Sequence, residues 1–199
     1  MYRFYEDFTT HTDDFAAYNI EVEKTSNLEH KHGRVENGGY SLNCSGNKHL
    51  LMTPPLCDFS LSAKAKFTTT SFSIAAQDRN VFRNAGLFFV FDYNTVSKCG
   101  KKIEVVYNLE GKLTISLIAL NGIKHEEIDS KVYYNVDLCV DKTYEFKADA
   151  NGNNICGNFD NYTFDFDLSE RTKGRVGIGR CEFAGCLLYN DVLLTSDDI

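Results

Sequence analysis

Strict alternation of apolar and polar residues over short stretches is the feature that most limits how this 199-residue chain can fold. In Phe59–Phe67 every odd position is apolar and every even position is polar, and Leu113–Leu117 and Tyr144–Ala148 repeat this pattern. A period of two places alternate side chains on the two faces of a β-strand. No stretch of ten or more residues has the period of a helix, so the sequence predicts an all-β fold.

Turn-forming pairs separate these stretches at the spacing of β-hairpins. They are Glu110-Gly111, Asn121-Gly122 and Asn151-Gly152. Asn-Gly suits the type I′ turn because both residues tolerate a positive φ. The turns delimit about a dozen short strands, enough for two packed sheets. We therefore predict one domain over residues 1–199, a two-sheet antiparallel β-sandwich of the jelly-roll kind.

The charge balance and the apolar runs limit the classes of partner. The formal net charge is −7, whereas nucleic acids and anionic membrane surfaces bind positively charged proteins. The longest apolar runs, Gly86–Phe91 and Leu113–Leu120, are far too short to cross a bilayer as a helix. The sequence predicts neither a nucleic-acid partner nor a membrane partner.

The seven cysteines are odd in number and include no C-x-x-C pair. Exported domains held together by disulfides usually carry an even set. We therefore predict reduced thiols in a cytoplasmic protein. The alternative is a module excised from a longer secreted protein, in which Cys181 and Cys186 form a local bridge.

Several short segments, in this order along the chain, are similar to segments of one large β-sandwich superfamily. They are Val35–Leu42, Leu50–Leu56, Asp58–Lys64, Ala85–Phe91, Gly174–Gly179 and Tyr189–Val192. On these residues the chain resembles the concanavalin A-like lectins and glucanases, and most closely the laminin-G-like jelly rolls and the 3-keto-disaccharide hydrolase-like domains. The resemblance implies a jelly roll. This superfamily contains lectins, carbohydrate-binding modules and glycosidases, so the question of enzymatic activity stays open.

Two departures weigh against an enzyme. Keto-sugar hydrolase-like domains tend to place an Arg where this chain has Val90. Glucanases carry acidic residues at alternate positions of one strand, and the nearest string here, Asp165–Glu170, is better interpreted as a solvated acidic turn. Our main prediction is a carbohydrate-recognition domain, free-standing or accessory to a glycoside-active enzyme. The alternative is a glycoside hydrolase, or a keto-sugar hydrolase or lyase, acting on a small glycoside.

Sugar recognition on a β-sheet needs flat aromatic surface flanked by groups that form directed hydrogen bonds. The chain has no Trp but 11 Tyr, and some of the Tyr lie near charged residues in the sequence. For a saccharide or small glycoside we predict a binding site on a curved outer face. Its predicted residues are Arg79, Arg83, Asp92, Tyr93, Glu104 and Tyr107. If the protein is an enzyme, Glu104 is the candidate acid or base.

Carboxylates near the two ends of the chain suggest a structural metal. First and last strands of jelly rolls commonly pair, which would bring Glu6 or Asp7 close to Asp191. Oxygen-rich surroundings of this kind suit Ca²⁺, and we predict no other cofactor. The alternative is that backbone N–H groups satisfy the Asp191 side chain. His30-Lys31-His32 is interpreted as part of a solvated loop.

Overall fold

The computed structural model describes most of the chain. The described residues are 1–8, 21–23, 34–36, 38–42, 48–51, 53–68, 84–108, 110–122, 124–139, 142–170, 173–181 and 186–197. Arg79, Arg83, His30 and His32 lie outside them. Among the described residues, no helix has the length and apolar character needed to cross a membrane.

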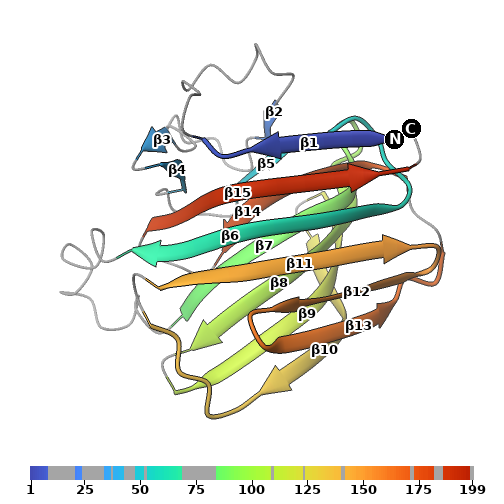
Figure 1. Ribbon diagram of the computed structural model, residues 1–199. Coiled ribbons are helices and arrows are strands. Elements are labelled where there is room, and N and C mark those ends of the chain that lie inside the picture. Colours follow the sequence, from blue (N-terminus) through green and yellow to red (C-terminus); the bar gives the residue numbers. More distant parts are fainter. Residues whose placement is uncertain are drawn as a thin grey trace.

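Two antiparallel sheets pack face to face, so the predicted all-β sandwich is confirmed (Figure 1). Sheet A has the order β13-β12-β11-β6-β15-β4-β3, with β1 also paired to β15, and sheet B has the order β10-β9-β8-β7-β14-β5-β2. The strands of sheet A are β1 (Tyr2–Glu6), β3 (Arg34–Glu36), β4 (Gly39–Leu42), β6 (Phe59–Thr68), β11 (Thr143–Asn151), β12 (Asn154–Phe159), β13 (Tyr162–Asp167) and β15 (Cys186–Ser196). Those of sheet B are β2 (Glu21–Glu23), β5 (Lys48–Leu51), β7 (Asn84–Asn94), β8 (Cys99–Asn108), β9 (Lys112–Asn121), β10 (Lys124–Tyr133) and β14 (Arg175–Cys181).

The hairpin turns lie where the sequence predicted them. Gly111, Gly122 and Gly152 have φ values of +80°, +62° and +60° at the β8–β9, β9–β10 and β11–β12 turns. Because a positive φ strains residues that carry a Cβ, glycine is the natural choice at these three positions. Sheet B therefore contains a continuous meander from β7 to β10.

Aromatic side chains fill the space between the sheets. The Phe89 ring of sheet B lies 5.1 Å from the Phe146 ring and 6.3 Å from the Phe59 ring of sheet A, measured between centroids. Tyr189 of β15 is also buried, and its hydroxyl donates to the Gly179 carbonyl of β14 at 2.6 Å. This bond satisfies a buried polar group and ties the two sheets together behind the centre of sheet B.

A β-bulge interrupts β7 near its end. Phe91 lies opposite Lys101 of β8, but the next pair along the strand is Asn94 with Cys99. Asp92, at the bulge, has a φ of +53°. Its carboxylate accepts hydrogen bonds from the Lys173 N–H at 2.9 Å and from the Lys101 ammonium at 3.1 Å. The bulge shifts the alternation of β7 by one position, and this shift decides where the next residue, Tyr93, points.

Candidate functional site

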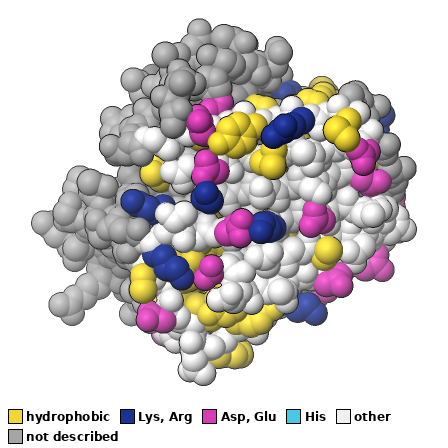
Figure 2. Space-filling view, viewed as in Figure 1, with side chains coloured by type: hydrophobic (Ala, Val, Ile, Leu, Met, Phe, Trp, Pro, Cys, Tyr) yellow, Lys and Arg dark blue, Asp and Glu magenta, His cyan; other side chains and the backbone are white. Residues whose placement is uncertain are grey.

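The outer faces of the two sheets differ in burial. On sheet A, Glu145, Lys147 and Asp149 alternate with buried residues and are exposed to solvent. Figure 2 views the molecule from this side and shows charges of both signs scattered among uncharged groups. On sheet B, the outward-facing Phe88 and Val90 of β7 are only 2% and 0% exposed. Beside these buried side chains the outer face of sheet B carries polar groups on β8, β9 and β10, and this combination is the candidate site.

We call this set the sheet B face. It combines an apolar cluster with polar groups of β8, β9 and β10. The apolar members are Phe88, Val90, Tyr93, Val106, Ile118 and Leu120, and the polar members are Lys102, Glu104, Ser116, His125, Glu127 and Ser130. The strand register sets them in rows, because side chains opposite one another on neighbouring strands lie side by side. In one row Glu104 lies between Phe88 and Ser116, and in the next Lys102 lies between Val90 and Ile118.

An ion pair occupies the centre of the sheet B face. The Lys102 ammonium donates to the Glu104 carboxylate two residues along the same strand. The Lys102 side chain is 2% exposed and the Glu104 side chain 15%. The ammonium also lies over the Phe88 ring, 5.0 Å from its centroid, an arrangement that favours a cation. The pair is thus a fixed charged group within an apolar surface.

A second carboxylate is held two strands away. Glu127 of β10 accepts hydrogen bonds from the hydroxyls of Ser116 at 2.9 Å and Ser130 at 3.2 Å, one on each carboxylate oxygen. Its side chain is exposed, whereas Ser116 is buried. Two serine donors therefore orient a carboxylate that still reaches solvent, at the side of the face nearest β10.

His125 of β10 lies beside these charges, opposite Leu120 of β9. Partial burial, and after it the Lys102 ammonium, lowers the pKa of the imidazole below its ordinary value, while the Glu104 carboxylate opposes this effect. The imidazole is therefore neutral at pH 7 and can both donate and accept a hydrogen bond.

The titration of His125 gives a test of this arrangement. Replacing Glu104 by Gln is expected to lower the pKa of His125 further, because the opposing carboxylate is lost, and NMR titration of the imidazole measures the change. The folded chain takes up the His125 proton at a lower pH than the unfolded chain does. The free energy of unfolding should therefore decrease as the pH is lowered below about 6.5. A raised or unchanged pKa in Glu104→Gln would contradict the proximity of these groups.

Asp92 has a structural role, whereas Tyr93 lies on the same face as Glu104. The Asp92 carboxylate is used in the bulge of β7, where it bonds Lys101 and the Lys173 N–H, so it is not positioned as a ligand group. Tyr93, 4% exposed, lies in the apolar cluster of the sheet B face. The bulge puts Tyr93 on the same face as Glu104, as the prediction of a shared site required.

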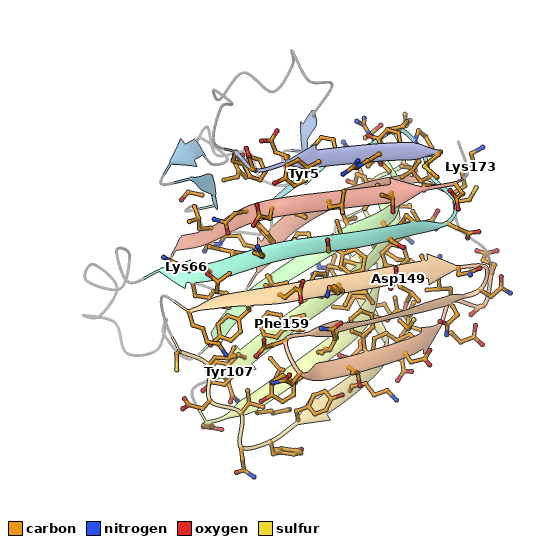
Figure 3. All side chains as sticks on the ribbon, viewed as in Figure 1. Tyr5, Lys66, Tyr107, Asp149, Phe159 and Lys173 are labelled. Atoms are coloured by element: carbon orange, nitrogen blue, oxygen red, sulfur yellow. The ribbon has the colours of Figure 1, made fainter. Side chains whose placement is uncertain are left out.

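The predicted pairing of Tyr107 with Glu104 is corrected by the structure. Tyr107 is 8% exposed and belongs to the core between the two sheets (Figure 3). Residues 104 and 107 are an odd number of positions apart on one strand, so their side chains point to opposite faces. Arg79 and Arg83 lie outside the described residues.

Of the three predicted metal ligands, Glu6 and Asp191 each have hydrogen-bond partners within the protein. β1 pairs with β15 as expected, with Glu6 opposite Val192. The Glu6 side chain is buried and accepts the Phe8 N–H at 2.5 Å. Asp191 instead bonds the Lys64 ammonium at 2.6 Å and the exposed Tyr5 hydroxyl at 3.3 Å on the outer face. In the described part of the chain no three His, Cys, Asp or Glu residues are grouped as metal ligands, and the Ca²⁺ site stays a prediction.

The acidic string Asp165–Glu170 is exposed at its charged positions, as predicted. Asp165 accepts a hydrogen bond from the Asn154 amide at 2.6 Å, and Asp167 accepts one from the Ser169 N–H at 2.8 Å. Both carboxylates lie on sheet A, away from the sheet B face. They stabilise the end of a strand and the turn that follows it.

Sequence reasoning missed most of the sheet B face. Lys102, Ser116, His125 and Glu127 were not predicted as site residues. One signal was available, because Leu87–Phe91 is apolar at every position and an uninterrupted apolar run indicates a strand covered on both faces. The register that brings Ser116 to Glu127 carries no such signal.

Comparison with known proteins supports the fold. No protein-family model matches the chain, and no curated protein matches its sequence. Among solved structures, the carbohydrate-binding module CBM66 from Bacillus subtilis is similar with a TM-score of 0.60 and 17% identity, over 79% of this chain and 87% of that one.

Two enzymes have the same architecture. The Bacillus licheniformis β-glucanase is similar with a TM-score of 0.61 and 10% identity, over 98% of each chain. The κ-carrageenase from Pseudoalteromonas carrageenovora, solved with an oligotetrasaccharide of κ-carrageenan, gives a TM-score of 0.58 and 11% identity, over 96% of this chain and 91% of that one. At these identities the likeness establishes a shared fold.

Proposed function

We propose that this chain, which has the concanavalin A-like jelly-roll fold, is a carbohydrate-recognition domain that binds a saccharide on the sheet B face. The observation that carries the proposal is the pair of fixed carboxylates there, Glu104 held by Lys102 and Glu127 held by Ser116 and Ser130. Carboxylates are strong acceptors for sugar hydroxyls, and the buried apolar cluster that includes Ile118 and Leu120 supports them from beside. Structurally similar proteins include a carbohydrate-binding module, which supports this class of ligand.

The ligand approaches from the side of β10. Glu127 and His125 are exposed there, whereas Lys102 and Val90 toward β7 are buried. Glu127 therefore makes the first polar contact, and Glu104 contacts the part of the sugar that reaches furthest over the sheet. His125 adds a neutral group that can donate or accept.

A glycan array and affinity measurements with any saccharide it identifies test the proposal. Glu104→Gln and Glu127→Gln should each weaken binding about tenfold, since a hydrogen bond to a charged group contributes about 1.5–3 kcal/mol. The matched control is Glu126→Gln. Glu126 is exposed on the same strand, but because it is next to Glu127 in sequence, its side chain points to the opposite side of β10. Unchanged affinity in both test variants would place the site elsewhere.

The same variants separate recognition from catalysis. Two carboxylates on one face also suit a glycosidase, in which one acts as acid or base. Turnover of aryl glycosides and 3-keto glycosides should then fall about 10²-fold or more in Glu104→Gln while binding persists. A recognition domain should show no turnover with these substrates and a modest loss of affinity.

A further inference from the structure

A cleft of about 610 Å³ lies at the edge of the sandwich where β10 and β13 are in contact. Lys131 and Tyr133 of β10 line one side of it, and Asn158, Thr163 and Asp165 of sheet A line the other. Lys131 and Tyr133 alternate along β10 with Ser130, whose hydroxyl bonds Glu127 on the sheet B face. The cleft therefore opens on the opposite side of β10 from the sheet B face.

Tyr133 forms a rigid aromatic wall of this cleft. Its hydroxyl donates to the Thr163 carbonyl, and its ring lies 5.1 Å from the Tyr162 ring, centroid to centroid. It also packs against the core between the sheets. An aromatic ring fixed by such contacts loses little side-chain entropy when a ligand binds against it.

Directed polar groups lie beside this ring. One oxygen of Asp165 accepts the Asn154 amide at 2.6 Å, and the Asn158 amide nitrogen donates to the Asp160 carbonyl at 2.7 Å. These bonds orient both side chains and leave Asp165 Oδ2 and Asn158 Oδ1 as acceptors. The Thr163 hydroxyl and the Lys131 ammonium add donors. An apolar ring beside fixed acceptors and donors matches the apolar and hydroxyl-bearing sides of a sugar ring.

We propose that this cleft is a second saccharide site, which takes one or two sugar rings in contact with Tyr133, Asn158 and Asp165. Its volume falls within the range of about 300–1,000 Å³ typical of small-ligand sites. The site uses no residue of the sheet B face, so it does not depend on the function proposed above. If both sites bind, one polysaccharide or two neighbouring chains can be held at two points, which raises the overall affinity.

Amide NMR titration of the whole chain tests this proposal with four probes. They are methyl β-D-glucopyranoside, methyl β-D-galactopyranoside, methyl α-D-mannopyranoside and methyl β-D-fructofuranoside. At least one is expected to shift the amide signals of Lys131, Tyr133, Asn158 and Asp165 with saturation below about 50 mM, as weak single-ring binding implies. If none of the four moves these signals up to that concentration, the proposal is overturned.

Variants then assign the binding to the cleft. Asn158→Ala and Asp165→Ala should each weaken the titration at the cleft about tenfold, whereas Glu126→Ala, an exposed carboxylate of β10 outside the cleft, should not. Shifts that persist unchanged in both cleft variants would overturn the site. Because the amides of Val90 and Glu104 report separately on the sheet B face, failure at one site is distinguished from failure at the other.

Discussion

Replacing Lys102 by Met is expected to destabilise the fold by about 3–5 kcal/mol, because it leaves the Glu104 carboxylate without its partner inside a buried apolar surface. Contact of the Lys102 ammonium with the Phe88 ring is lost as well. Denaturant unfolding measures the change as a shift of the midpoint at constant slope. The double variant Lys102→Met with Glu104→Leu should recover most of the loss, since a buried ion pair replaced by apolar side chains of similar size costs little.

Sheet A supplies a matched control for this experiment. Glu145 and Lys147 of β11 form a pair with the same spacing of two residues and an oxygen–nitrogen distance of 3.0 Å, but their side chains are 48% and 46% exposed. Lys147→Met should therefore change stability by no more than about 1 kcal/mol. Equal effects of Lys147→Met and Lys102→Met would mean that the centre of the sheet B face is solvated.

Gly174→Ala is expected to destabilise the fold by about 3–5 kcal/mol, the range of the most damaging single substitutions. An alanine Cβ at this position would lie 2.2 Å from the Asp92 carbonyl carbon and 2.4 Å from the Tyr93 nitrogen. Both are main-chain atoms of the β7 bulge, so the strand itself would have to move. Denaturant unfolding measures the loss of stability, and the bulge displacement should also shift the amide signals of the sheet B face around Tyr93.

The variant Gly122→Ala distinguishes the loss of stability caused by steric crowding of a new Cβ from the loss caused by backbone strain. Gly122 has a φ of +62° at the β9–β10 turn, and a Cβ there would meet no atom within 4 Å. The expected loss of stability is only about 1–2 kcal/mol, the cost of a left-handed backbone conformation for a residue that carries a Cβ. If Gly174→Ala proves no more destabilising than Gly122→Ala, the close approach of residue 174 to the bulge is disproved.

The strands of the fold were predictable because they depend on local pattern. The alternation in Phe59–Phe67 and Tyr144–Ala148 corresponds to β6 and β11, and the Asn-Gly pairs lie at hairpin turns. The assignment of strands to sheets was not predictable from the same pattern. β6 pairs with β11 and β15, far away in sequence, through contacts that leave no trace in the local alternation.

The candidate site was predicted only in part, for the same reason. Glu104 and Tyr93 do lie on one face, but Tyr93 reaches it through the bulge at Asp92, a backbone irregularity that no residue type announces. Tyr107 could have been excluded from the sequence, since its odd spacing from Glu104 places it on the other face of the strand. Ser116 and Glu127 meet through the register of β9 with β10, and this register shifts between Glu127 and Asp129, an irregularity that the Asn121-Gly122 turn does not reveal.

The position of β15 in sheet A has a consequence for the order of events in folding. β15 lies between β6 on one side and β4 and β1 on the other, and Tyr2 is opposite Ser196. The β7–β10 meander of sheet B needs only hairpin contacts, which form within microseconds. Closing β1 against β15 encloses nearly the entire chain in one loop, and topologies dominated by such distant pairings fold in milliseconds to seconds. Refolding should therefore begin with local hairpins such as the β7–β10 meander, with the pairing of β15 to β1, β4 and β6 as the slow step.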